Sequence, residues 1–184
     1  MVLILSQIIG ITAVALYLLS FQLKKRGQIV GVTCLSYLFY VIQYLMLRAF
    51  SGAILDILSA GLSFGAGHKN APRFRRYAKW VAVAGLGAIV AAGLIITFLQ
   101  RDPIELLPIA GAGLQAGGLW FNKEQTIRWF GLAGAPFWLV YNFMSQAYGA
   151  AVGAALTILS TTVALIRFKS NVSVVKNGKS GIIK

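Results

Sequence analysis

Seven long apolar stretches alternate with short polar interruptions along the 184-residue chain. Each stretch has close to the ~20 residues that one α-helix needs to cross the hydrocarbon core of a bilayer. Their approximate bounds are 2–23, 28–47, 51–67, 78–99, 104–122, 126–146 and 147–167. The pattern predicts an all-α, polytopic membrane protein with seven transmembrane helices. The second and third helices, and the sixth and seventh, are expected to form hairpins.

The composition excludes several classes of protein. Hydrophobic residues make up 58% of the chain and charged residues 11%, which leaves too little polar surface for a soluble domain. A single cysteine, Cys34, excludes a disulfide within the chain, and one cysteine with one histidine, His68, cannot build a structural zinc site. No nucleophile elbow or phosphate loop occurs. We therefore expect no enzyme, no cofactor and no metal site.

The first apolar stretch is expected to be retained as a helix. No basic residue precedes the run that opens at Val2, and no small-residue cleavage site follows it. Both features are needed in a cleaved signal peptide.

The basic residues predict an orientation, because lysine and arginine stay on the cytoplasmic side of a membrane. With the N-terminus outside, 15 of the 17 basic residues fall in the cytoplasm and only Arg48 and Arg101 lie outside. This split requires an odd number of crossings and puts the C-terminus in the cytoplasm. The +13 net charge is thereby explained by topology, so we expect no nucleic-acid partner. The basic tail 168–184 either serves this orientation or lies on anionic lipid headgroups.

The chain carries an internal repeat. A shift of 98 residues lays 20–62 on 118–160 without a gap, and the polar turns coincide as well as the helices. Identical pairs under this shift are Lys25 and Lys123, Ile29 and Ile127, Phe39 and Phe137, Met46 and Met144, Ala49 and Ala147, Ala53 and Ala151, and Leu58 and Leu156.

Two repeats of three helices can face the same way only if one further crossing separates them. The stretch 78–99 supplies that crossing, and its small residues allow close helix packing. These small residues are Ala84, Gly85, Ala88, Ala92 and Gly93. The predicted organisation is 3+1+3 with parallel repeats. Its segments are 1–67 for the first repeat, 68–100 for a basic loop and linker helix, 101–167 for the second repeat and 168–184 for a basic tail.

Several segments resemble a known family. The run from Ser20 to Arg26, the aromatic helix after it and the run from Phe50 to Ala60 resemble the YgjV-like bacterial inner-membrane proteins, and Trp138 to Asn142 with Ala147 to Gly149 resemble the second half of that family. The resemblance implies a bacterial inner-membrane location and kinship with the SWEET, PQ-loop and PnuC-type transporters. It thereby implies a SWEET-like fold and transport of a small solute. The Pro-Gln pair that marks PQ-loop proteins is absent here, and Ser20 stands near the expected proline.

Two helices place polar and aromatic residues at the same positions of the repeat. Tyr40, Gln43 and Tyr44 are spaced i, i+3, i+4 and therefore share a helix face. Trp138, Tyr141 and Asn142 occupy the same three positions under the 98-residue shift. Such groups suit a midplane pocket that stacks on a sugar-like or nucleoside-like ring and hydrogen-bonds to it. The alternative is anchoring of Trp and Tyr at the headgroup level.

Asp56 is an acidic residue inside an apolar stretch, where a charge costs about 2.5–3.5 kcal/mol on insertion scales. Lying four residues after Gly52, it is expected about 6 Å below that loop, in the outer half of the membrane. It could contact a solute, exchange a proton, pair with Arg48 or Arg101, or stay a neutral acid. The resemblance implies a pocket position, because SWEET relatives have an asparagine on this helix. The repeat mate is Ala154, so the pocket would be asymmetric in charge.

Hydroxyl residues continue the Asp56 face. Ser59 and Ser63 have Thr157 and Thr161 as repeat mates. They either line a solute path, for which Ser59 and Thr157 are the candidates, or hydrogen-bond between helices. The run 69–79 is basic and either holds anionic lipid or simply sets the orientation.

Two function classes follow from these patterns. The first is a carrier for a small polar solute, sugar-like or vitamin-like, that works by alternating access between two three-helix bundles. The second is a membrane subunit that does not transport and instead binds lipid or a partner membrane protein. Association of copies of the chain into a homo-oligomer is compatible with either class.

Overall fold

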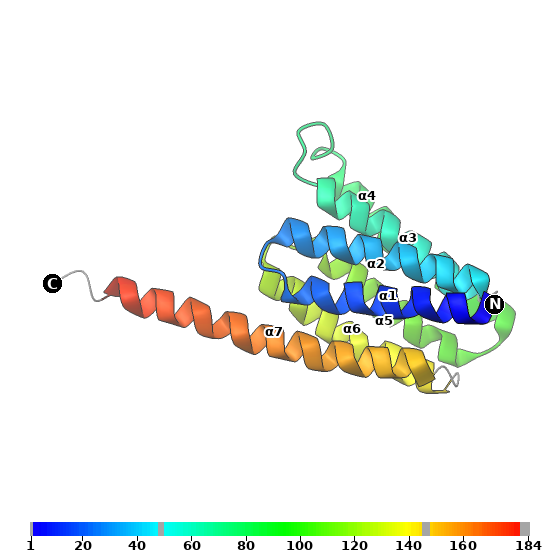
Figure 1. The fold of residues 1–184 in the computed structure, drawn as a ribbon. Helices are drawn as coiled ribbons and strands as arrows, with labels where there is room; N and C mark the ends of the chain where they lie inside the picture. The colour runs from blue at the N-terminus through cyan, green and yellow to red at the C-terminus, as the bar shows by residue number, and fades with distance from the viewer. Residues whose placement is uncertain (1, 48–49, 145–147, 181–184) are drawn as a thin grey trace.

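A computed structural model describes residues 2–47, 50–144 and 148–180 (Figure 1). Over these residues the chain forms seven α-helices and a short 3-10 helix, η1, which confirms the predicted all-helical fold. The elements are α1 (Val2–Gln22), α2 (Arg26–Met46), α3 (Phe50–His68), α4 (Ala78–Gln100), η1 (Pro103–Glu105), α5 (Leu106–Gly118), α6 (Glu124–Met144) and α7 (Tyr148–Ser180).

Four of the described helical segments are long and apolar enough to cross a membrane. They are Ile4–Gln22, Arg26–Met46, Ala78–Gln100 and Ala150–Phe168. Helix α5 has 13 residues and is therefore about 20 Å long, shorter than a hydrocarbon core of about 30 Å. The predicted count of seven crossings, and the orientation of the termini, stay predictions.

Two helices have ends that differ from those of the predicted apolar stretches, although the span Ala150–Phe168 agrees with the seventh stretch. The fifth helix was expected over 104–122, but α5 is shorter. Pro103 opens the separate helix η1 before it, and a glycine pair stands at its C-terminal end. The seventh was expected to end near 167, yet α7 continues to Ser180. No proline or glycine interrupts the chain between Gly153 and Gly178, and hydropathy marks where a membrane span ends rather than where a helix ends.

The helices form a ring with one helix outside it. Helix α2 packs between α1 and α3, and α6 packs between α5 and α7. Contacts of α3 with α5 and of α1 with α7 close the ring, while α4 packs on α3 and α5 from outside (Figure 1). On α4, Gly85 lies against Leu62 and Gly93 lies against Ile109, so its small residues do mark close helix contacts.

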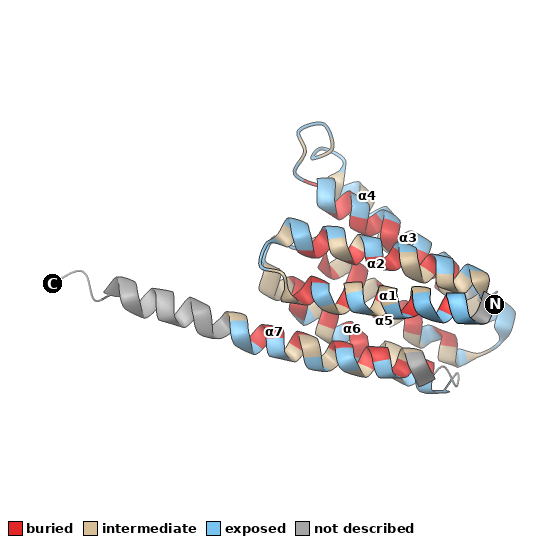
Figure 2. Cartoon of the chain, viewed as in Figure 1, coloured by how far each residue is buried: buried red, intermediate tan, exposed pale blue. Residues whose placement is uncertain are grey.

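The bundle has an apolar exterior and keeps many polar side chains inside. Large apolar side chains such as Ile11, Phe98 and Ile166 are exposed, and exposed and buried positions alternate along the helices in Figure 2. Polar side chains are buried between the helices, and the fully buried ones include Ser6, Ser20, Ser36, Ser59, Ser63 and Thr161. An apolar exterior with polar groups kept between the helices suits a hydrocarbon solvent, because water is not available to hydrate exposed polar groups.

Helices α5 and α6 approach so closely that their backbones touch. A Cβ added at Gly134 would lie 2.9 Å from the Gly111 carbonyl oxygen and 2.7 Å from Cγ of Gln115. Small residues permit such packing in lipid. The contact fixes α6 against α5 one turn before Trp138.

We expect Gly134→Ala to destabilise the protein by about 1–3 kcal/mol, because the added methyl group meets backbone that cannot move aside. Gly113→Ala on α5 is the matched control, since a Cβ there meets nothing within 4 Å. Thermal unfolding in detergent would measure both. Equal unfolding temperatures for the two variants would contradict the close packing.

Candidate functional site

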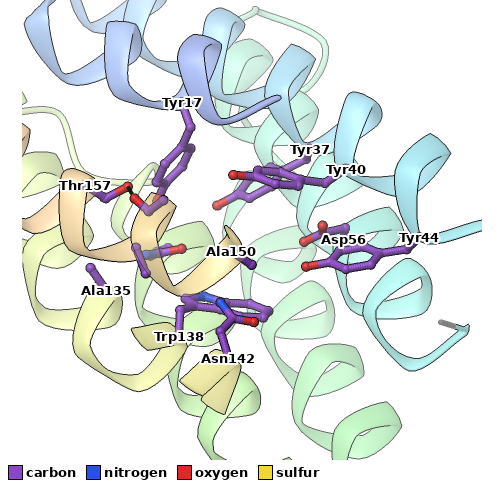
Figure 3. Close-up of a pocket in the computed structure, with 13 residues that line it drawn as sticks. Tyr17, Tyr37, Tyr40, Tyr44, Asp56, Ala135, Trp138, Asn142, Ala150 and Thr157 are labelled. Atoms are coloured by element: carbon purple, nitrogen blue, oxygen red, sulfur yellow. Dashed lines mark hydrogen bonds between the residues drawn. The ribbon is translucent and has the colours of Figure 1, made fainter. Parts of the chain in front are cut away.

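A cavity lies inside the ring and receives side chains from all six ring helices (Figure 3). It contains about 500 Å³ of empty space, including the part that opens toward the surface. The lining residues are Tyr17, Tyr37, Tyr40, Tyr44, Asp56, Gln115, Ala135, Trp138, Asn142, Ala150, Gly153, Ala154 and Thr157. The space is thus bounded by aromatic rings, one carboxyl group and a few neutral polar groups.

Helix α2 supplies three of the tyrosines from one face. Tyr37, Tyr40 and Tyr44 lie at i, i+3 and i+7, which places them within an arc of about 60° on a helix. The Tyr40 and Tyr44 rings stack with centroids 6.2 Å apart, and Tyr17 on α1 meets Tyr37 at 6.1 Å. Together they form a continuous aromatic wall along the first half of the ring.

Asp56 on α3 brings its carboxyl group to this wall. Its side chain is only 4% exposed, and Figure 3 shows it beside Tyr44 and below Tyr40. Within the described residues it makes no ion pair or hydrogen bond. The predicted alternative of pairing with Arg101 is not found, because Arg101 is exposed at the C-terminal cap of α4. The other predicted partner, Arg48, lies outside the described residues.

Six of the nine predicted site residues reach the cavity wall. They are Tyr40, Tyr44, Asp56, Trp138, Asn142 and Thr157. That any of them binds a solute stays a prediction.

The other three predicted site residues do not line the cavity. Gln43 lies against Gly10 of α1, Ser59 is fully buried, and the Tyr141 hydroxyl donates to Oε1 of Glu105 at 3.3 Å. Gln43 is rotated about 60° from Tyr40, away from Tyr44, and Tyr141 is rotated likewise from Trp138. A shared helix face was therefore too coarse a criterion for either residue.

Several residues of the cavity wall were not among the predicted site residues. Tyr37 lies one turn before Tyr40, so extending the aromatic face would have found it. The lining contains five pairs whose members are 98 positions apart, namely Tyr17 and Gln115, Tyr37 and Ala135, Tyr40 and Trp138, Tyr44 and Asn142, and Asp56 and Ala154. Continuing the alignment toward the N-terminus would have identified Tyr17 and Gln115. The small residues Ala150 and Gly153 carry no chemical signal in sequence.

Three cations join the two halves of the ring at one end. We call Arg26, Lys69 and Arg128 the basic closure. Arg26 on α2 donates to the carbonyl oxygens of Leu119 and Phe121 at the end of α5, each at 2.8 Å. Helix C-termini leave carbonyl groups without partners and carry partial negative charge, so a cation there is stabilising.

The second half of the ring makes the corresponding contact with the first half. Arg128 on α6 is 2% exposed and donates to the carbonyl oxygens of Phe21 at 3.0 Å and Leu23 at 2.7 Å, at the end of α1. The Phe168 ring lies 4.2 Å from the guanidinium carbon. Each half thus supplies an arginine that caps the first helix of the other half.

Lys69 completes the basic closure. Although the sequence places it in an exposed basic run, it is only 9% exposed and its ammonium group donates to the carbonyl oxygen of Trp120. Burial, with a smaller contribution from the positive charge of Arg26, lowers the pKa of Lys69 from 10.5 to about 8.

Comparison with known proteins gives one match. A family model described as "Bacterial inner membrane protein" matches residues 4–172. No curated protein and no solved structure matches the chain significantly. Kinship with the SWEET and PQ-loop transporters therefore stays a prediction.

We expect Arg128→Met to lower stability by about 1–3 kcal/mol, because it leaves the carbonyl groups of Phe21 and Leu23 buried without a donor. Arg75→Met in the exposed loop after α3 is the control and should change little. Thermal unfolding in detergent would measure the difference. If the two variants unfold at the same temperature, the carbonyl contacts of Arg128 contribute nothing.

The lowered pKa of Lys69 predicts that the stability of the protein depends on pH. Because its pKa is lower in the folded than in the unfolded chain, the unfolded chain binds more protons between pH 8 and 10.5, and stability should rise with pH in that window. Below about pH 8 both states are protonated and the penalty is constant. Unfolding midpoints of the wild type and of Lys69→Met, measured from pH 7 to 10, should diverge above pH 8. Parallel curves would argue against a buried ammonium group.

Proposed function

The chain belongs to the Imp-YgjV family of bacterial inner membrane proteins, and from that premise we propose that it is a carrier that binds a small polar solute in the central cavity. The observation that carries this proposal is the cavity itself, which gathers aromatic and polar side chains from six helices inside a bundle with an apolar exterior. Polar and ionisable groups inside a membrane are costly and commonly mark solute paths.

We further propose that the ring consists of two parallel three-helix repeats, with α4 as the linker. Support comes from the five lining pairs that are 98 residues apart and from the exchanged contacts of Arg26 and Arg128. Each pair takes one residue from each half, as a binding site between pseudo-symmetric repeats would. This arrangement is the one implied by the resemblance to SWEET transporters.

The proposed transport cycle rocks one half of the ring against the other. Hydrogen bonds of the basic closure tie the halves together at one end, whereas Tyr44 and Asn142 stand near the opposite ends of α2 and α6. Because the basic end is cytoplasmic by the distribution of charge, this conformation is closed to the cytoplasm. Opening that end would require the arginines to release their carbonyl partners.

A flux assay in proteoliposomes tests the carrier proposal. With a panel of radiolabelled hexoses, nucleosides and vitamin precursors, the wild type should move at least one solute, and Trp138→Ala should reduce that flux roughly tenfold through loss of ring contact. Trp129→Ala is the matched control, since Trp129 lies on the same helix but is 60% exposed on its outer face. Equal loss in both variants would place the effect outside the cavity.

The alternative of a non-transporting subunit has its own outcome in this assay. If the purified protein moves no solute of the panel but copurifies stoichiometrically with another membrane protein, the carrier proposal is wrong and a subunit role replaces it.

A further inference from the structure

The charge of the cavity differs in sign from that of the protein. The chain has 17 Lys and Arg against 4 Asp and Glu, yet among the described residues the cavity lining contains one of the four acids, Asp56, and no base. The three cations of the basic closure are engaged with backbone carbonyl groups.

The described residues supply no partner for a negative charge on Asp56. A carboxylate removed from water is strongly disfavoured unless a cation or several hydrogen-bond donors compensate it. The described residues supply neither an ion pair nor a hydrogen bond to it, and its side chain faces the cavity (Figure 3). An ionised Asp56 would take its counter-charge from the occupant of the cavity.

The surrounding walls suit the same occupant. Aromatic rings present a negative face that attracts cations, most strongly when water is excluded. Four tyrosines and Trp138 line the cavity, and Tyr40 and Tyr44 stand directly beside Asp56. An aromatic enclosure with one carboxylate is the arrangement that recognises substituted ammonium and other organic cations, whose apolar surface a hydrated metal ion lacks.

We propose that the cavity binds a small organic cation, with its charged group between Asp56 and the tyrosines of α2. The inference rests on the proposed function for its location and narrows the solute to a chemical class. Gln115, Asn142 and Thr157, from the other half of the ring, provide hydrogen-bonding groups for the uncharged part of the solute. A neutral sugar would leave an ionised Asp56 without compensation.

Pairs of cations and neutral molecules of the same shape test the inference on the wild-type protein. Three pairs are suitable: choline with 3,3-dimethylbutan-1-ol, 1-methylnicotinamide with 3-methylbenzamide, and guanidinium with urea. Thermal shift and tryptophan fluorescence in detergent, at constant ionic strength, should show at least one cation binding tenfold or more tightly than its neutral partner. If no cation exceeds its partner, the inference is wrong.

Two single substitutions test whether Asp56 causes the preference for the cation. Asp56→Asn keeps the shape of the side chain and should abolish the preference for the cation. Glu105→Gln is the matched control, because Glu105 is a buried carboxyl group outside the cavity lining and its contact with Tyr141 can persist. Loss of the preference in Glu105→Gln but not in Asp56→Asn would overturn the assignment. Equal stabilisation by sodium or potassium chloride would show a response to charge alone and would also overturn it.

The outcomes separate this inference from the carrier proposal. Flux of a neutral solute that depends on Trp138 but not on Asp56 would overturn the organic cation while leaving the carrier intact. Cation binding that depends on Asp56, without flux of that cation into proteoliposomes, would support the site and overturn the carrier.

Discussion

The surrounding hydrocarbon is the constraint on which the rest of the structure depends. Because lipid offers no hydrogen bonds, polar groups must find partners inside the bundle or face an internal space. The exposed surfaces of α1, α4 and α7 are accordingly apolar, and serine and threonine side chains point between helices. Because polar groups are kept inside and apolar groups face the lipid, a ring of helices can enclose a cavity lined by Asp56 and Asn142 without exposing either residue.

The same constraint explains why the two ends of the ring differ. Where α1 and α5 end, their last carbonyl groups would be buried without donors, and Arg26, Lys69 and Arg128 supply them. These bonds join the halves at that end. Toward the other end, where Tyr44 and Asn142 lie, aromatic and amide side chains surround empty space instead. Hydrogen bonds thus join the two halves at one end of the ring, whereas a cavity separates them in its interior.

Helix periodicity predicted much of the candidate site but not its edges. Tyr40, Tyr44, Trp138 and Asn142 reach the cavity because a residue and its i+4 neighbour differ by only about 40° around a helix. Gln43 lies at the edge of this face, about 60° from Tyr40, and packs against Gly10 instead. Which part of a helical face points inward depends on the rotation of the helix, and close backbone contacts such as that between α5 and α6 set this rotation.

The sequence predicted the helical elements, their number and the apolar character of the outer surface, because each apolar run is a local property of about 20 residues. It also singled out Asp56 as a costly charge. Packing in three dimensions was needed to show that α7 closes the ring against α1, that Gln43 lies against Gly10 and not in the cavity wall, and that Arg101 does not approach Asp56. These facts depend on contacts between residues far apart in the chain, which no local pattern encodes.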